Sequence, residues 1–214
     1  MTLKIYGMLR SRAARNAWMC EELGVAYEKV PVIQAYRLAD PAAPDAPLNT
    51  HSPAFRKVNP NGHIPSIDDG GLVLHESLAI NLYLARKHGG ALAPRDLREE
   101  GLVYMWTLWA ATEVEPHSVL IVQNVGKDQN AVDRAAAALP GPFAVLAAAL
   151  QQGGGYLVGG RFTVADLNVA EVLRYAQPVP ALFAAQPAVK AWIEACQARP
   201  AFKKVMQDRA AEPA

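Results

Sequence analysis

The stretch Asn59-Pro60-Asn61-Gly62-His63-Ile64-Pro65-Ser66-Ile67 decides the fold of the N-terminal half, together with Glu76-Ser77 a short distance downstream. The Asn-Pro and Asn-Gly pairs predict a turn that leads into a short apolar strand, and Pro65 stands where that strand begins. A proline fits the first residue of a strand because it has no N–H for the ladder. A cis bond between Ile64 and Pro65 would expose the backbone groups of Ile64 to an extended peptide.

The pair Glu76-Ser77 stands where the sequence predicts the start of a helix. The free N–H groups at a helix start favour a carboxylate. A peptide-like ligand with an acidic end would therefore use this pair and the backbone of Ile64 together. The alternative interpretation is a capped helix with an acidic residue at its positive end.

Composition limits the protein to a few classes. The chain has 214 residues, is 51% hydrophobic and carries a formal net charge of +1, so it can bury one large core or two small ones. No basic stripe indicates nucleic acid or an anionic membrane as a partner. The cysteines Cys20 and Cys196 are far apart and lack a C-x-x-C spacing, which argues against a disulfide framework and a structural zinc site. Neither a signal-peptide pattern nor an apolar run of membrane-spanning length is found, so we expect a cytoplasmic protein.

The N-terminal half has the pattern of a small α/β domain. Ala13, Ala17, Cys20 and Gly24 recur with helical spacing, and Gly24 is a typical helix stop. The predicted elements are strands at 3–6 and 25–30 around a helix that starts at Ser11, a hairpin of strands at 64–67 and 72–74, and a helix from Glu76-Ser77 to Gly89. The β-α-β order predicts a parallel strand pair. Residues 34–50 are rich in proline and show no period, which predicts a loop that is either mobile or ordered only on demand.

The second half has alanine- and leucine-rich helical segments that prolines and glycines interrupt. Residues 156–158 are apolar but too short to predict a paired strand. We expect about five helices packed as a bundle. The predicted fold class is therefore α/β followed by all-α, with one domain at residues 1–88 and a second at 96–214.

Four motifs in this order resemble the cytosolic glutathione transferase family over nearly the whole chain. They are Asn59–Pro65, Glu76-Ser77, Phe162-Thr163-Val164-Ala165-Asp166-Leu167 and Arg199-Pro200-Ala201-Phe202. The resemblance implies a thioredoxin-like N-terminal domain of order βαβαββα followed by an α-helical domain. It also implies a homodimer that uses glutathione as a co-substrate, with no cofactor, and conjugates it to a small hydrophobic electrophile.

The resemblance implies that Ser11 is the catalytic residue, as in the serine-type classes of the family (theta, zeta and plant phi). Its hydroxyl would donate to the glutathione thiolate and, with the positive end of the helix, lower the pKa of the thiol. A helix cap is the alternative for Ser11. Tyr6 is the rival catalytic residue, because tyrosine-type classes carry the hydroxyl at the end of the first strand. No cysteine lies between Tyr6 and Trp18, which disfavours the cysteine-type mechanism, and Cys20 is expected in the core.

Further site residues follow from the same resemblance. The backbone of Ile64, before Pro65, would pair with the cysteinyl unit of glutathione, and Glu76 and Ser77 would hold the γ-glutamyl amino and carboxylate groups. His51 or His63 would lie near the glycyl carboxylate, although residues 37–49 resemble an insertion at that end of the site. The second-substrate pocket would be formed by Met8, Leu9, Trp106 and Trp109.

Several other patterns favour structural roles. Thr163 and Asp166 have the spacing of a capping box, and the aromatic run 104–109 is typical of a core helix. The acidic and histidine residues at 113, 115 and 117 are spaced by two, so one helix would not bring them together to bind a metal. Arg12 and Arg15 could steer carboxylates, form dimer salt bridges or be solvated.

Three functions remain open on sequence alone. A glutathione transferase is the function we expect. The same thiolate could instead serve a glutathione-dependent isomerase, peroxidase or disulfide reductase, and a non-catalytic member of the fold would bind a larger partner. Ser11 and an intact Glu76-Ser77 pair favour an enzyme, whereas the fold alone would not.

Overall fold

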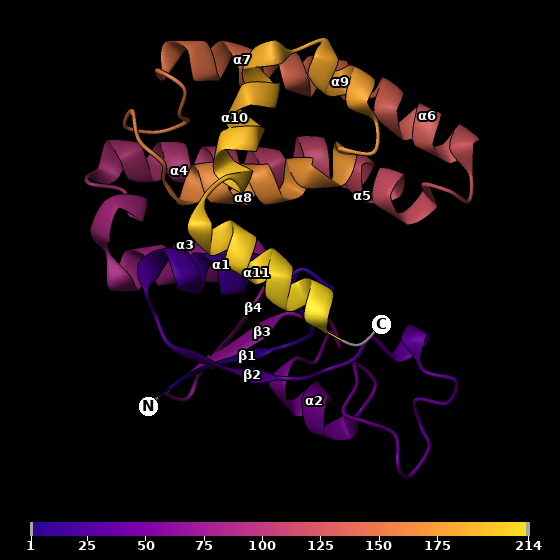
Figure 1. Ribbon diagram of the computed structural model, residues 1–214. Helices are drawn as coiled ribbons and strands as arrows, with labels where there is room; N and C mark the ends of the chain where they lie inside the picture. Colours follow the sequence, from indigo (N-terminus) through magenta and orange to yellow (C-terminus); the bar gives the residue numbers. More distant parts are fainter. Residues whose placement is uncertain (1, 213–214) are drawn as a thin grey trace. The chain divides into compact units, whose positions relative to one another are not determined.

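The computed structural model describes residues 2–212, and packing divides the chain into two units that are considered separately (Figure 1). Unit 1 contains the residues up to His88 and those from Pro200 onward, and unit 2 contains Gly89–Arg199. The sequence-based division placed the end of the chain in the helical domain. Contacts group the last helix with unit 1 instead, because this helix packs against the first helix of the chain.

Unit 1 has a four-stranded sheet with helices. In chain order its elements are β1 (Leu3–Tyr6), α1 (Ala13–Leu23), β2 (Tyr27–Val30), the 3₁₀ helix η1 (Ala35–Arg37), α2 (Pro53–Val58), β3 (Ser66–Asp69), β4 (Leu72–His75), α3 (Ser77–His88) and α11 (Pro200–Ala211). The strand order is β2-β1-β3-β4. Strand β1 runs parallel to β2 and antiparallel to β3, which is antiparallel to β4. The predicted βαβαββα order, parallel pair and hairpin are confirmed.

The strand limits differ slightly from the prediction. Strand β3 begins at Ser66 rather than Ile64, because Pro65 has no N–H to offer a neighbouring strand. Strand β2 begins at Tyr27, after Gly24 has ended α1 in a left-handed conformation with φ of 65°.

Helix α1 is the centre of unit 1. Its residues Ala13 to Cys20 are all buried, because α1 is in contact with β1, α3 and α11. The indole of Trp18 packs edge-on against the ring of Phe202 in α11, with ring centroids 4.9 Å apart. Two alanines at the predicted helix face, Ala13 and Ala17, are fully buried.

The proline-rich segment after β2 is folded onto a buried amide. Asn49 is 0% exposed, and its side-chain Nδ2 donates to the carbonyl oxygens of Pro41 at 3.0 Å and Pro47 at 2.9 Å. The backbone of Ile33 accepts from the N–H of Thr50 at 2.9 Å and so joins the two ends of the segment. The segment therefore has defined internal contacts that its irregular sequence did not predict.

Unit 2 is all-α, as predicted. Its elements are the 3₁₀ helix η2 (Gly90–Leu92), α4 (Leu97–Trp109), the π-helix η3 (Ala110–Val114), α5 (Glu115–Asn124), α6 (Gln129–Ala137), α7 (Pro140–Gln152), α8 (Val164–Leu173), the 3₁₀ helix η4 (Arg174–Ala176), α9 (Pro180–Ala184) and α10 (Pro187–Gln197). The expected number of about five helices was too low. Each of α7, α9 and α10 starts on a proline, so these prolines open new helices rather than only ending old ones. No single helix within residues 2–212 has the length and apolar character needed to cross a membrane.

Helix α8 is the core of unit 2, and all of its residues are buried. Its start is the predicted capping box, which is confirmed: Thr163 Oγ1 accepts from the N–H of Ala165, and Asp166 Oδ2 accepts from the N–H of Thr163 at 2.9 Å. Asp166 Oδ1 also accepts from the N–H of Leu157 and from the indole N–H of Trp192, each at 3.1 Å. One buried carboxylate thus joins a loop, α8 and α10.

Candidate functional site

The turn between β1 and α1 carries Ser11. It begins at Gly7, where a Cβ would lie 3.0 Å from the Cβ of Ala13 and 3.3 Å from that of Ile64. With a φ of 143°, Gly7 also has a backbone conformation that favours glycine. The turn therefore passes close to Ile64, which brings two of the sequence-predicted site residues to one end of the sheet.

The hydroxyl of Ser11 has two local partners. Ser11 Oγ donates to the carbonyl oxygen of Met8 at 2.6 Å and accepts from the N–H of Ala13 at 3.1 Å. The N–H of Ser11 donates to the same Met8 carbonyl at 3.1 Å. The N-cap residue of α1 is Arg12, which forms no side-chain cap bond, so the helix cap considered for Ser11 is not found. Ser11 lies one residue earlier, is half-buried, and accepts from the N–H of Ala13, the first residue of the helix.

Tyr6 has an aromatic neighbour. Its ring lies 6.4 Å, centroid to centroid, from that of the buried Phe55 in α2, with an interplanar angle of 41°. Its hydroxyl forms no hydrogen bond to any residue within 2–212. Packing alone accounts for this residue, so the local geometry gives Tyr6 no activating partner.

The hairpin register brings Ile64-Pro65 next to Glu76-Ser77. Ser66 in β3 pairs with His75 in β4, so the residues just before β3 and just after β4 are neighbours. The Ile64–Pro65 peptide bond is cis, and Ile64 is half-buried. Its backbone N–H and C=O form no hydrogen bond with any part of the chain that the structure describes. These two groups can pair with the backbone of an extended ligand.

Glu76 and Ser77 differ in exposure. Glu76 is exposed and has a φ of 71°, a left-handed conformation that is uncommon for residues other than glycine. Such residues cluster at ligand sites, where the surrounding structure holds them. Ser77 is 6% exposed and begins α3, so its N–H belongs to the first turn of a twelve-residue helix.

Two buried side chains of α1 hold Ser77, and the sequence analysis missed both contacts. Arg15 Nη1 donates to Ser77 Oγ at 3.2 Å, and Asn16 Nδ2 donates to the Ser77 carbonyl oxygen at 2.8 Å and to Asn81 Oδ1 at 2.7 Å. Arg15 is 0% exposed, so the solvated surface position considered for it is wrong. The helical spacing of alanines around Arg15 was the available signal, because it put this residue on a helix that is buried on nearly every side.

The two histidines lie on neighbouring exposed segments. Asn59 Nδ2 donates to the carbonyl oxygen of His63 at 2.8 Å, and the N–H of His51 donates to Asn49 Oδ1 at 2.9 Å. A Cβ on Gly62 would lie 2.7 Å from the Thr50 carbonyl oxygen, so the two segments are adjacent. Either histidine remains a candidate for the glycyl end.

The four residues predicted for the second-substrate pocket belong to different units. In unit 1, Met8 is half-buried and Leu9 is 2% exposed, which makes Leu9 a core side chain. In unit 2, the rings of Trp106 and Trp109 form an edge-to-face pair with centroids 5.1 Å apart. The assignment of these residues to one pocket stays a prediction.

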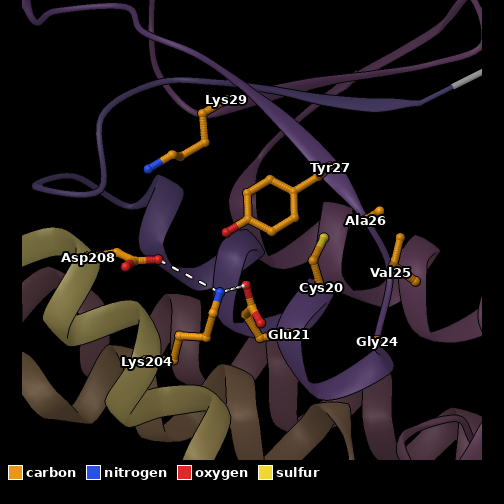
Figure 2. A pocket seen from close by; sticks show the side chains of 9 residues that line it. All are labelled: Cys20, Glu21, Gly24, Val25, Ala26, Tyr27, Lys29, Lys204 and Asp208. Carbon is orange, nitrogen blue, oxygen red and sulfur yellow. Dashed lines mark hydrogen bonds and ion pairs between the residues drawn. The ribbon is translucent and has the colours of Figure 1, made fainter.

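An open cavity of about 470 Å³ lies elsewhere in unit 1, beside the end of α1, β2 and α11 (Figure 2). Lys204 of α11 forms ion pairs there with Glu21 and, at 3.8 Å, with Asp208. Burial raises the pKa of the Cys20 thiol to about 12, so this thiol is neutral and unreactive at neutral pH. The position of Cys20 in the core is confirmed, and the cavity contains none of the predicted site residues.

Comparisons with known proteins identify the family of this chain. Family models for the N-terminal and C-terminal domains of glutathione S-transferases match residues 5–92 and 109–200. Glutathione S-transferase 3 of Zea mays is 36% identical over 95% of this chain and 93% of its own length. A probable glutathione S-transferase of Oryza sativa subsp. japonica, GSTF1, is 33% identical over 95% of this chain and 94% of its own length.

Solved structures give the same result. The structure of a glutathione S-transferase III in apo form has a TM-score of 0.81 and 34% identity, with complete coverage of both chains. Glutathione S-transferase I from maize, in complex with an atrazine glutathione conjugate, has a TM-score of 0.83 and 30% identity, also with complete coverage of both chains. The family models and the full-length relatives therefore agree, and the chain belongs to the glutathione S-transferase family.

Proposed function

We propose that this glutathione S-transferase ionises the thiol of glutathione at Ser11 and conjugates the thiolate to a small hydrophobic electrophile. The observation that carries the proposal is the meeting of three features at one end of the sheet. These are the hydroxyl of Ser11, the unpaired backbone of Ile64 and the first turn of α3 at Ser77.

Ser11 is prepared to act as a donor. The N–H of Ala13 donates to Ser11 Oγ, and accepting this bond makes the hydroxyl a stronger donor to a third group. When the hydroxyl turns toward a thiolate, the carbonyl of Met8 keeps the hydrogen bond from the N–H of Ser11. The reorientation therefore leaves no backbone group of the turn without a partner. The start of α1 adds a favourable field for the anion.

Binding would orient the tripeptide by its ends and its middle. The backbone of Ile64, before Pro65, would pair with the cysteinyl unit. The γ-glutamyl carboxylate would accept from the N–H and Oγ of Ser77, with the buried guanidinium of Arg15 behind it. Glu76 would bind the γ-glutamyl amino group. His51 or His63 would meet the glycyl carboxylate, most strongly when protonated.

The electrophile would lie beside the half-buried Met8, in the turn that carries Ser11. Glutathione is a co-substrate in this proposal, and Ser11 forms no covalent bond. The sulfur–carbon bond forms as the thiolate attacks and the leaving group of the electrophile departs, or as an activated double bond receives the sulfur and then a proton. A homodimer in the cytoplasm completes the proposal, as the family resemblance implies. Sedimentation equilibrium of the full chain tests the dimer.

A titration of the protein with glutathione tests the function. The ultraviolet absorbance of the thiolate is followed between about pH 5 and 9, a range that includes the ordinary thiol pKa of about 8.5 and lower values. We expect the apparent pKa of the bound thiol to fall clearly below that of free glutathione. Binding without this fall in the thiol pKa would favour reductase chemistry or a role as a glutathione carrier. The absence of glutathione binding would contradict the proposed enzyme activity.

Two variants separate the catalytic candidates. We expect Ser11→Ala to lower kcat by about ten- to a thousandfold, which is the usual loss for one preorganised donor, with little change in glutathione affinity. Tyr6→Phe is the matched control, because it also removes one hydroxyl, and we expect kcat near that of the parent. The opposite pattern would reassign the catalytic role to Tyr6.

A further inference from the structure

The turn that carries Ser11 is held by charged side chains from distant parts of unit 1. Arg209 Nε, in the last turn of α11, donates to the carbonyl oxygen of Leu9 at 3.1 Å. The N–H of Arg10 donates to Glu212 Oε2 at 3.3 Å, across 202 positions of the chain. Arg10 Nη2 adds a bond of 3.3 Å to the carbonyl oxygen of Ala210. Charged side chains and backbone groups at the end of α11 thus form hydrogen bonds with the turn.

These contacts fix the peptide plane that leads into the catalytic serine. The carbonyl of Leu9 and the N–H of Arg10 belong to one peptide group. Arg209 donates to its carbonyl oxygen and Glu212 accepts from its N–H, so both polar groups of this peptide are held. The next peptide group joins Arg10 to Ser11. Its carbonyl accepts from Arg37 Nη2 at 3.4 Å, and its N–H donates to Met8, so this group is also bound at both ends.

Hydrogen bonds with a charged partner are stronger than neutral ones, although the distances of 3.3 and 3.4 Å make these three moderate individually. Their arrangement matters more than the strength of each. Two successive peptide groups held at both ends leave the backbone before Ser11 little freedom to rotate. The position of the Ser11 Cβ follows from that backbone, so the places that Oγ can reach are limited to the staggered rotamers of χ1.

We propose that Glu212 and Arg209, at the end of α11, are positioning residues for Ser11. They touch no substrate and act through the backbone of Leu9 and Arg10. The inference rests on the proposed function of Ser11. It adds that thiol ionisation depends on a segment at the opposite end of the sequence.

The test compares two charge-removing substitutions at the end of α11. Glu212→Ala removes the partner of the Arg10 N–H. Asp208→Ala, one turn earlier, is the matched control: Asp208 pairs with Lys204 beside the cavity in Figure 2 and has no bond to the turn among the described residues. Glu212→Gln is the rescue variant, because its amide oxygen still accepts a hydrogen bond. Each full-length variant is assayed with glutathione for the apparent pKa of the bound thiol, kcat, the KM for glutathione and Tm.

We expect Glu212→Ala to lower kcat by roughly three- to thirtyfold, because small misplacements of a catalytic group have effects of this size or larger. The pKa of the bound thiol should rise, the KM for glutathione should change by less than about twofold, and Tm should match that of Asp208→Ala. Glu212→Gln should recover most of the kcat. Hydrogen exchange should become faster at the Arg10 amide in Glu212→Ala, a readout that needs no activity.

The outcomes distinguish the two proposals. If the parent lowers the thiol pKa and Glu212→Ala behaves like Asp208→Ala in thiol pKa, kcat and exchange, this inference is wrong and the proposed function stands. A lower Tm with unchanged thiol pKa and kcat would show a purely structural contact and would also overturn it. If the protein without substitutions binds glutathione but does not lower the pKa of the glutathione thiol, both proposals are wrong.

Discussion

Replacing Asp166 with alanine should destabilise unit 2 more than almost any other single substitution of a polar residue there. The carboxylate is fully buried and accepts from four donors: the N–H groups of Leu157 and Thr163, the hydroxyl of Thr163 and the indole of Trp192. Alanine leaves both backbone N–H groups and the indole N–H buried without an acceptor. At about 1 to 2 kcal/mol for each of these three unsatisfied donors, we expect a loss of about 3 to 6 kcal/mol in the free energy of unfolding.

The negative charge of Asp166 contributes less to the free energy of unfolding than its hydrogen bonds do. Burial raises the pKa of Asp166, and the four donors counteract only part of that effect, so the ionised carboxylate carries a desolvation cost in the fold. Asp166→Asn removes this cost and keeps one acceptor oxygen, but turns an NH₂ group toward one set of donors. We expect a loss of about 1 to 3 kcal/mol for this variant. Trp192→Phe removes a single donor and should cost about 1 kcal/mol beyond the change in packing.

Urea unfolding followed by circular dichroism at fixed protein concentration measures these differences, and hydrogen exchange at the amides of α8 shows whether the loss is in unit 2. Asp133→Ala is a control, because Asp133 is an exposed acid on α6, and such changes stay within about 0.5 kcal/mol. A loss below about 1 kcal/mol for Asp166→Ala would refute the reasoning, since it would mean that water or a rearranged loop satisfies the freed donors.

Three further outcomes are expected. Arg161 holds the pKa of Glu99 near 2, below its ordinary value of 4.5, so the pair stabilises the fold above pH 4.5 and loses its effect as the pH falls toward 2. Because solvent reaches this pair, Glu99→Gln should cost about 1 kcal/mol at neutral pH and nothing near pH 2 in urea unfolding; a constant difference would contradict this. Cys20 should resist iodoacetamide at pH 8 until the protein unfolds, as mass spectrometry of the labelled chain can show, and rapid labelling would argue against its burial. Asn49→Ala should increase proteolytic cleavage at about residues 38–48 at least severalfold with little change in Tm, and unaltered cleavage would show that the two proline carbonyls need no donor.

The sequence predicted those parts of the fold that depend on local patterns. The helix of α1 followed from alanine spacing, the hairpin from the two short apolar segments at 64–67 and 72–74, and the start of α8 from the Thr163–Asp166 spacing. Each pattern lies within about a dozen residues, so the residues that determine the element all lie in it or beside it. The sequence could propose Ile64, Pro65, Glu76 and Ser77 as candidate site residues for the same reason, because the turn and the helix start that carry them are local.

What the sequence did not predict depends on tertiary packing. Arg15 is charged and was compatible with the surface, but α3 and α11 cover the helix that carries it. The link from Glu212 to Arg10 joins the two ends of the chain, and no spacing rule connects residues so far apart. The prolines that open α7, α9 and α10 were interpreted as breaks, because proline ends one helix and begins another with the same residue type.

The packing of α11 on α1 also has a consequence for how the protein is made. A ribosome synthesises the chain from its N-terminus, and domains generally fold as units in that order. Unit 1 departs from this order, because its early part needs contacts from α11. Trp18 packs on Phe202, and the turn before Ser11 is bonded to Arg209 and Glu212. Helix α1 and the turn before Ser11 are synthesised well before α11 but can make these contacts only after it. A nascent chain therefore carries the apolar face of α1 uncovered until α11 has been synthesised, and a chaperone could bind that face during this interval.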